Sequence, residues 1–222
     1  CNVEFVIEHQ KETLRTLGCT FDHWFKESSL DKKNILSAIK SKFSHYVYEK
    51  DQATWFKTTA FNDDKDRVIK KENGELTYFA ADILYHLNKI DRGYQHLINI
   101  WGADHHGYIP RIESVIKANH SDTKLTVILG QLVHLYKNGE AIKMSKRTGE
   151  LIKLSEVMEE IGIDATRYFL LEKKPEQHLD FDLSIASEKS MENPVYYIQY
   201  AHARICTIIE KTNNLPMSAE LE

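Results

Sequence analysis

Two lysines three residues apart, Lys143 and Lys146, are the first side chains whose spacing could serve chemistry. They lie in the run Lys143-Met144-Ser145-Lys146-Arg147, which follows a predicted hairpin. Two ammonium groups with a hydroxyl between them can neutralise a triphosphate and stabilise the charge that moves onto departing pyrophosphate. Composition alone favours a solvated basic loop or a localisation-type cluster. The place of the loop, after a strand–helix–strand unit and a hairpin, favours the phosphate-binding interpretation.

A second group of polar side chains follows a short apolar segment that is predicted to be a strand. Residues 101–107 read WGADHHG, with Gly102 at the strand end and Asp104, His105 and His106 after it. Glycine lets a ligand approach the backbone closely, and the polar side chains can contact it. A turn with satisfied side chains remains an alternative. A metal site is disfavoured because three consecutive ligands rarely converge on one ion without distant partners.

The third candidate is the pair Tyr78 and Asp82, which lie four residues apart and therefore on one face of a predicted helix. A carboxylate can pair bidentately with a guanidinium, and a phenol can donate a hydrogen bond to a ligand or stack on it. Taken alone, such a pair is more often part of a solvated helix face.

The elements around these residues predict an α/β fold. Residues 97–101 form a short apolar strand, residues 109–118 have helical periodicity with Pro110 in the first turn, and residues 125–129 form a second apolar strand. Strand, crossover helix and strand make a βαβ unit with a parallel sheet. Ligands bind at the carboxyl ends of such strands, which here means the segment that starts at Gly102.

The rest of the chain is predicted to be helices and hairpins. Polar residues 63–67 are predicted to be a loop. Hairpins are expected over 46–58, around Asn73-Gly74 and around Asn138-Gly139, since Asn-Gly is a strong hairpin signal. Further helices are expected up to residue 17, with Gly18 as the stop signal, and over 30–43, 79–90, 155–161 (N-cap Ser155), 164–171 (N-cap Asp164) and 193–211 (N-cap Asn193, then Pro194).

Composition excludes several classes of protein. The 222 residues are 42% hydrophobic and 28% charged, which is ordinary for a globular protein. No apolar run approaches the length of about 18 residues that a membrane helix needs. The 29 basic and 33 acidic residues give a net charge of −4, which excludes a bulk nucleic-acid coat but allows a local basic site.

The cysteines and the chain ends indicate where the protein works and how much of it is present. The three cysteines, Cys1, Cys19 and Cys206, form no C-x-x-C pair, which argues against a disulfide framework and predicts a reducing, cytoplasmic environment. Because the chain begins with Cys and ends in Leu-Glu, we expect it to be a piece of a larger protein.

Together these motifs resemble one family closely. The run KMSKR resembles the KMSKS signature of class I aminoacyl-tRNA synthetases, and its surroundings resemble bacterial arginyl-tRNA synthetases in particular. The resemblance covers most of the chain, in order, over residues 63–93, 99–112, 139–154, 164–171 and 178–205. It implies a reaction in which arginine and ATP form arginyl-adenylate and pyrophosphate, after which the arginyl group passes to tRNA. The implied partners are arginine, ATP with Mg²⁺, and tRNA, with no membrane and a monomer at full length.

The resemblance also implies roles for single residues. The implied catalytic lysines are Lys143 and Lys146. The residues implied to bind ATP are Gly102, Asp104, His105, Met144 and Ser145. Tyr78, Asp82 and Asp104 are implied to bind arginine, and no residue is assigned to a metal. Because a guanidinium is always charged, an arginine pocket needs a fixed carboxylate, which Asp82 supplies.

The family's architecture implies three parts in this chain. Residues 1–76 would be a connective insert of helices and hairpins. Residues 77–190 would be the second half of a class I synthetase Rossmann-like nucleotide-binding fold, an α/β fold with inserted hairpins. Residues 191–222 would begin the α-helical bundle that binds the anticodon.

The sequence departs from the family pattern at three places. The family's other signature, His-x-Gly-His, does not occur, so we expect the 222-residue chain alone to be inactive. Gln52 stands where the family pattern has glycine, so the hairpin there is expected to use another turn. Arg147 replaces the final serine of the signature. Two alternatives remain: a metal-dependent phosphoesterase, suggested by Asp104-His105-His106, and a non-catalytic tRNA-binding paralogue.

Overall fold

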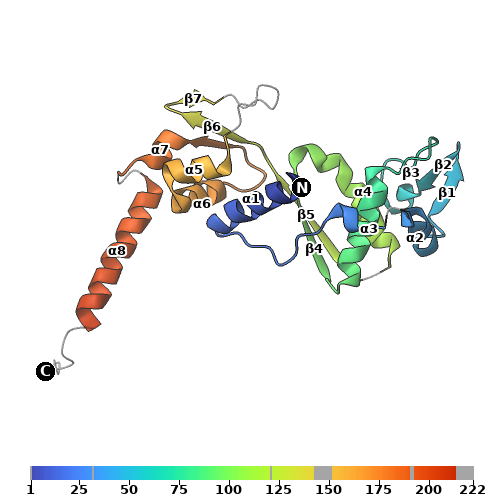
Figure 1. The fold of residues 1–222 in the computed structure, drawn as a ribbon, viewed down its shortest axis with the longest axis horizontal. Coiled ribbons are helices and arrows are strands. Elements are labelled where there is room, and N and C mark those ends of the chain that lie inside the picture. Colours follow the sequence, from blue (N-terminus) through green and yellow to red (C-terminus); the bar gives the residue numbers. More distant parts are fainter. Residues whose placement is uncertain (1, 32, 121, 143–151, 191–192, 214–222) are drawn as a thin grey trace. The chain divides into compact units, whose positions relative to one another are not determined.

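The computed structural model describes residues 2–31, 33–120, 122–142, 152–190 and 193–213 (Figure 1). The chain forms two compact units. One unit is Phe21–Gln131, and the other combines Cys1–Thr20 with Leu132–Glu222. No helix of the described part is long and apolar enough to cross a membrane.

An antiparallel sheet and a helix open the Phe21–Gln131 unit. The sheet has the order β1-β2-β3, and its elements are β1 (Val47–Lys50), β2 (Ala53–Phe56) and β3 (Arg67–Lys70). Helix α2 (Ile35–Lys42) begins five residues later than predicted. The Asp31 carboxylate accepts hydrogen bonds from the backbone N–H groups of Lys33 and Asn34. This local turn competes with helix formation, and it explains the late start.

The β1–β2 hairpin keeps a left-handed turn without glycine. Asp51 and Gln52 have φ of 52° and 57°, and type I′ turns require positive φ at both central residues. The expectation that Gln52 would force another turn was therefore wrong. The left-handed conformation costs roughly 1–2 kcal/mol for a residue with a side chain. The Trp55 indole N–H, 3.1 Å from the Lys50 carbonyl, helps to hold the strand ends together.

The predicted βαβ unit is confirmed and follows helix α3 (Tyr78–Asp91). Its parts are β4 (His96–Gly102), α4 (Ile109–Ala118) and β5 (Lys124–Gly130). The two strands are parallel and in register from His96↔Lys124 to Gly102↔Gly130, so both end at the same edge (Figure 1). Pro110 stands in the first turn of α4, where its missing N–H has no intrahelical partner to lose.

One apolar core holds this unit together. It joins the inner faces of α2, α3 and α4 to strands β2 and β3. Its most deeply buried side chains are Ile35, Ile39, Phe43, Phe56, Ile69, Ile83, Ile112 and Val115. Truncating one of these to alanine should cost about 2–5 kcal/mol, which is the usual range for a large buried side chain.

The other unit is built on a three-stranded sheet of order β7-β6-β8. Strand β6 (Val133–Lys137) pairs antiparallel with β7 (Glu140–Ala141) across the predicted Asn138-Gly139 turn, and parallel with β8 (Leu179–Asp182). The core joins Leu135 and Phe181 of this sheet to Val157 and Leu183. The helices are α1 (Asn2–Thr16), α5 (Leu154–Ile161), α6 (Ile163–Glu172), α7 (Leu183–Ser187) and α8 (Pro194–Asn213).

Two predicted N-caps of this unit were wrong. Ser155 is already inside α5, and the Glu156 carboxylate instead accepts a hydrogen bond from the backbone N–H of Lys153 at 3.1 Å. Gly162, with φ of +87°, precedes α6. Asp164 lies in the first turn of α6, and its carboxylate accepts a hydrogen bond from the Gln199 amide of α8 at 2.8 Å.

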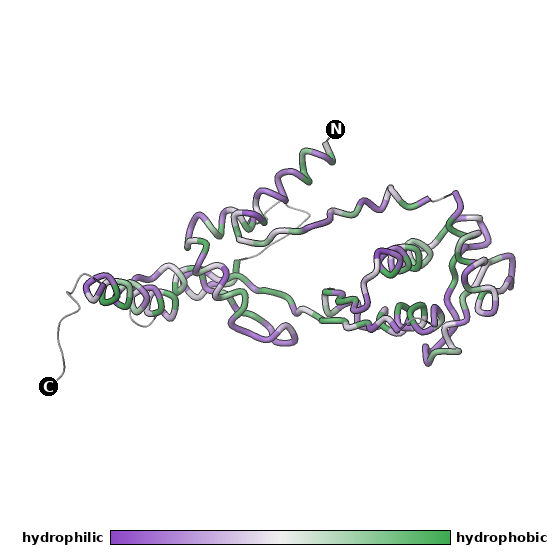
Figure 2. The backbone as a smooth tube through the Cα atoms, turned by 90° about the horizontal axis from the view of Figure 1, so that it is seen from below, coloured by the Kyte–Doolittle hydropathy of each residue, from purple (hydrophilic) through white to green (hydrophobic). Residues whose placement is uncertain are grey.

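The predicted start of α8 is confirmed. The Asn193 side-chain oxygen accepts a hydrogen bond from the backbone N–H of Val195 at 3.0 Å, and Pro194 is the first helical residue. Hydrophobic residues recur along this helix (Figure 2). Its isoleucines Ile198, Ile205, Ile208 and Ile209 are each exposed.

Candidate substrate-binding site

The predicted site begins where strand β4 ends. Gly102 is the last residue of β4, and a short 3-10 helix, Ala103–Tyr108, follows it. A Cβ atom on Gly102 would lie 2.6 Å from Oδ1 of Asp104, so any side chain there would displace that carboxylate. The Asp104 side chain is 83% exposed, and its Oδ2 lies 3.8 Å from Nε2 of His105, which is also exposed. Both side chains are therefore open to a ligand.

Asp82 lies in a different environment, half-buried on helix α3. Its Oδ2 accepts a hydrogen bond from the Tyr108 phenol at 2.6 Å. Burial raises the pKa of the Asp82 carboxyl above its ordinary value, the hydrogen bond from Tyr108 lowers it, and the Glu27 carboxylate raises it. Together these effects raise the pKa of Asp82. Keeping Asp82 ionised therefore costs free energy, which a bound cation would offset.

Tyr78 stands at the N-terminus of the same helix, and the residue is 86% exposed. It lines a hollow of about 460 Å³ together with Thr77, Lys71, Leu76 and others. No hydrogen bond joins the Tyr78 side chain to another residue of the described ranges. The pair Tyr78 and Asp82 thus consists of one exposed phenol and one half-buried carboxylate.

A buried chain of hydrogen bonds lies beneath Asp82. The backbone carbonyl of Asp82 lies 2.8 Å from Nδ1 of His86, and Nε2 of His86 lies 2.9 Å from the Asn99 amide nitrogen. The Lys89 ammonium donates to the Asn99 side-chain oxygen at 3.0 Å. Burial lowers the pKa of His86 to about 4, and the Lys89 charge adds to this effect. His86 is therefore neutral at physiological pH.

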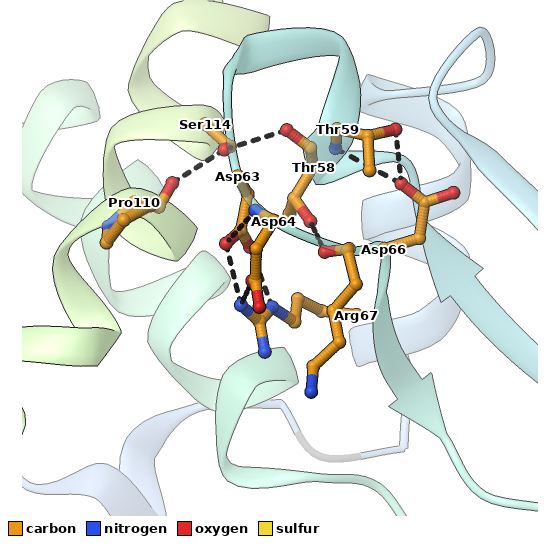
Figure 3. A network of polar contacts seen from close by, with 9 residues as sticks. Thr58, Thr59, Asp63, Asp64, Asp66, Arg67, Pro110 and Ser114 are labelled. Carbon is orange, nitrogen blue, oxygen red and sulfur yellow. Dashed lines mark hydrogen bonds and ion pairs between the residues drawn. The ribbon is translucent and has the colours of Figure 1, made fainter.

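The predicted acidic loop is part of the scaffold (Figure 3). Arg67 donates to both carboxylate oxygens of Asp63, at 2.6 and 2.7 Å, and also pairs with Asp64. The Asp63 side chain is 1% exposed. Burial acts to raise the pKa of Asp63, but the hydrogen bonds from Arg67 and from the Asp64 backbone N–H outweigh it and hold the pKa well below its usual range.

The same loop is tied to its neighbours by hydroxyl groups. Thr58 donates to the backbone carbonyl of Lys65 at 2.7 Å, and Thr59 donates to Asp66 at 2.7 Å. The Ser114 hydroxyl of α4 lies 3.4 Å from the Thr58 carbonyl oxygen, and it donates to the Pro110 carbonyl within α4 at 2.6 Å (Figure 3). These carboxylates are occupied by protein donors. Across the described ranges, no three His, Cys, Asp or Glu side chains are grouped so that they could hold a metal ion.

Several predicted site residues cannot be placed. Lys143, Met144, Ser145 and Lys146 lie outside the described residues. The structure brings together the predicted Asp82 and a residue that the sequence argument missed, Tyr108, which is 26 positions away. His86 and Asn99 were also missed. Asn99 did leave a signal, since it is a polar residue at an inward position of an otherwise apolar strand.

Comparison with known proteins shows which class of protein this chain resembles. The family model for class I tRNA synthetases, described as "tRNA synthetases class I (M)", matches residues 116–194. The crystal structure of an arginyl-tRNA synthetase from Campylobacter jejuni is 42% identical, with a TM-score of 0.82 over 92% of this chain and 45% of that one. An arginyl-tRNA synthetase of Thermus thermophilus, 16% identical with a TM-score of 0.75, shares the fold. Residues 116–194 therefore match the class I aminoacyl-tRNA synthetase family, and most of the chain is similar in sequence and fold to arginyl-tRNA synthetases.

Relatives that match nearly all of this chain are arginine–tRNA ligases. An arginine–tRNA ligase of Acinetobacter baylyi is 49% identical over 214 residues, which is 96% of this chain and 36% of the ligase. One of Bacillus licheniformis is 49% identical over 215 residues, 95% of this chain and 38% of the ligase. The chain is thus a homologue of part of the arginine–tRNA ligases, and it spans little more than a third of their length.

Proposed function

We propose that this chain forms part of an arginine–tRNA ligase. The observation that carries the proposal is Asp82, a half-buried carboxylate with a raised pKa, close in sequence to Tyr78 and joined by Tyr108 to the end of β4. Such a group is a poor stabiliser of the empty protein and a good partner for a guanidinium, which never loses its charge. Its setting in a chain 49% identical to arginine–tRNA ligases supports arginine as the cation.

The remaining roles follow the family pattern. Tyr78 would contact the arginine beside Asp82, and Asp104 would hold its other polar groups. Gly102 and His105 would border the ATP, with Met144 and Ser145. Lys143 and Lys146 would neutralise the triphosphate and stabilise the departing pyrophosphate. Mg²⁺ would accompany the ATP.

The proposed organisation has three parts. Residues 1–76 form the connective insert, residues 77–190 the second half of the nucleotide-binding fold, and residues 191–222 the start of the anticodon-binding bundle. The whole protein would act on tRNA as a monomer in the cytoplasm. Catalysis belongs to the whole protein, because the 222 residues contain no His-x-Gly-His signature.

The test is ATP–pyrophosphate exchange by the whole protein that contains this chain, with tRNA present. We expect exchange with arginine and a rate lower by roughly a hundredfold or more with lysine. A site built to hydrogen-bond one polar group rejects a substrate that leaves its own groups unpaired, by about 10⁴–10⁵-fold where the match is complete. The absence of arginine-dependent exchange, with tRNA binding retained, would instead favour a non-catalytic tRNA-binding paralogue.

A further inference from the structure

Asp82 is held at its tip by one side chain that no sequence motif singled out. Within the described ranges, Tyr108 is the one side chain that donates a hydrogen bond to the Asp82 carboxylate, at 2.6 Å to Oδ2. We propose that Tyr108 is a positioning residue that fixes this carboxylate for the guanidinium of arginine. The inference rests on the proposed function, because it takes arginine as the ligand of Asp82.

Tyr108 is itself fixed by three other elements. Its ring packs edge-on against Trp101 of β4 at 5.9 Å and against Phe79 of α3 at 6.4 Å. The Arg111 guanidinium of α4 lies over the ring at 4.7 Å. These contacts come from three separate elements, so we infer that they leave the phenol little freedom to rotate. The hydroxyl is therefore aimed at Asp82 by packing, whether or not a ligand is bound.

The hydrogen bond from Tyr108 leaves room for the ligand. An ionised carboxylate can accept about four hydrogen bonds, two at each oxygen. Tyr108 uses one of these positions at Oδ2, and Oδ1 accepts none within the described ranges. A guanidinium can then take one position on each oxygen in the planar, bidentate arrangement that arginine favours. Because Tyr108 fixes the plane of the carboxylate, it would also fix the plane of the bound guanidinium.

The other end of the Asp82 residue is fixed by the buried chain of hydrogen bonds. The Asp82 carbonyl can only accept, so Nδ1 of His86 carries the proton and Nε2 accepts from the Asn99 amide. Asn99 then turns its oxygen to the Lys89 ammonium. Each donor in this chain of hydrogen bonds therefore faces an acceptor. It anchors the backbone of α3 at Asp82 to strand β4, while Tyr108 anchors the side chain.

The charged groups around Asp82 influence its pKa and therefore the pH dependence of arginine binding. Glu27 lies before α2 and acts to raise the pKa of Asp82, whereas Lys89 of α3 and His105 of the short 3-10 helix act to lower it. His86 of α3 is neutral, and Arg111 of α4 faces the Tyr108 ring. Removing the phenol hydroxyl deletes a hydrogen bond to the charged form of Asp82. The pKa of Asp82 then rises, and arginine binding is lost at a higher pH as the solution is acidified.

The test uses the whole protein that contains this chain and the variant Tyr108→Phe, which keeps the ring and removes the hydroxyl. We expect the KM for arginine in ATP–pyrophosphate exchange to rise roughly tenfold or more, as for a lost hydrogen bond to a charged group, with a smaller change in kcat. The acid limb of kcat/KM for arginine should move to higher pH. Tyr85→Phe is the matched control, because Tyr85 lies on the same helix as Asp82 and its ring packs against Phe25 at 4.5 Å.

Each outcome separates the inference from the function on which it rests. Wild-type protein without arginine-dependent exchange would overturn both. If Asp82→Asn raised the KM for arginine while Tyr108→Phe kept the wild-type KM and pH profile, the role of Tyr108 alone would be wrong. Should Tyr108→Phe fold poorly, a fluorinated tyrosine at position 108 keeps the packing and is a stronger donor. It should move the acid limb to lower pH, and an unmoved limb would overturn the inference.

Discussion

Two carboxylates of the Phe21–Gln131 unit, the buried Asp63 and the half-buried Asp82, have pKa values that are shifted in opposite directions. Asp63 receives two hydrogen bonds from Arg67, and its pKa lies well below the usual range in spite of burial. Asp82 receives one hydrogen bond from a neutral phenol, and burial leaves its pKa raised. We call Asp63 a closed acid, because Arg67 donates to both of its oxygens, and Asp82 an open acid, because only its Oδ2 accepts a hydrogen bond within the described ranges. A closed acid stabilises the scaffold, whereas an open acid can bind an added cation. Burial alone therefore does not distinguish structural acids from functional ones. The number and the charge of the groups that donate hydrogen bonds to each carboxylate do distinguish them.

The largest effect should come from opening the closed pair. Arg67→Leu leaves the Asp63 carboxylate buried without its cation, and the loss of one partner of a buried pair costs about 3–5 kcal/mol. Urea denaturation followed by tryptophan fluorescence measures this in the 222-residue chain, because Trp24, Trp55 and Trp101 all lie in this unit.

The matched control for Arg67→Leu is an exposed pair on α4. Lys117 and Glu113 lie 3.2 Å apart, and both side chains are about half exposed. Lys117→Met should cost less than about 1 kcal/mol, as exposed ion pairs usually do. Equal costs for the two substitutions would mean that Asp63 is not a closed structural acid.

An intermediate effect is expected in the pH dependence of stability. The folded-state pKa of Asp63 is lowered, so its stabilisation is present above the unfolded value, about 3.9, and is lost as pH falls through the folded value. The folded-state pKa of Asp82 is raised, so its ionisation destabilises the fold as pH rises through that value.

These two directions predict opposite results for two asparagine variants. Asp63→Asn should lower the urea midpoint at pH 7, and its deficit against wild type should shrink below about pH 4. Asp82→Asn should leave the midpoint at pH 7 unchanged or higher, because it removes a half-buried charge. A clear loss of stability in Asp82→Asn at pH 7 would contradict the contrast between the two acids.

The smallest effect on stability belongs to a third carboxylate, Asp104. Its side chain is 83% exposed, and the His105 ring nitrogen lies 3.8 Å from its carboxylate. Asp104→Asn should change the free energy of unfolding by less than about 0.5 kcal/mol, as surface substitutions usually do. In the whole protein it should still raise the KM for arginine or ATP. An unchanged KM for both substrates would remove Asp104 from the site.

Local signals in the sequence predicted much of the fold. Helix α4 has the predicted bounds because Pro110 and a regular apolar face mark it, and the parallel βαβ unit follows from its two apolar strands. The start of α2 was missed because the Asp31 turn competes with the helix. The Gln52 turn was missed because strand pairing on both sides overrode the preference for glycine.

The candidate site was only partly predictable, for a physical reason. The motifs identified Asp82, Asp104 and Gly102, since their types and spacing follow a family pattern. The hydrogen bond between Asp82 and Tyr108 joins residues 26 positions apart and depends on how α3 packs against the end of β4. Periodicity within one helix does not carry such information. A tyrosine that closes a polar motif is ambiguous until its neighbours in space are known.

Asp82 is the residue on which the proposed recognition of arginine most directly depends. Arginine binding to the whole protein, measured by calorimetry, tests it with Asp82→Asn against Asp91→Asn, an exposed acid at the end of the same helix. We predict that Asp82→Asn weakens arginine binding by roughly tenfold or more, as expected for a lost bond between charged groups, and that Asp91→Asn leaves it unchanged. Equal arginine affinity in wild-type protein and Asp82→Asn would contradict the account.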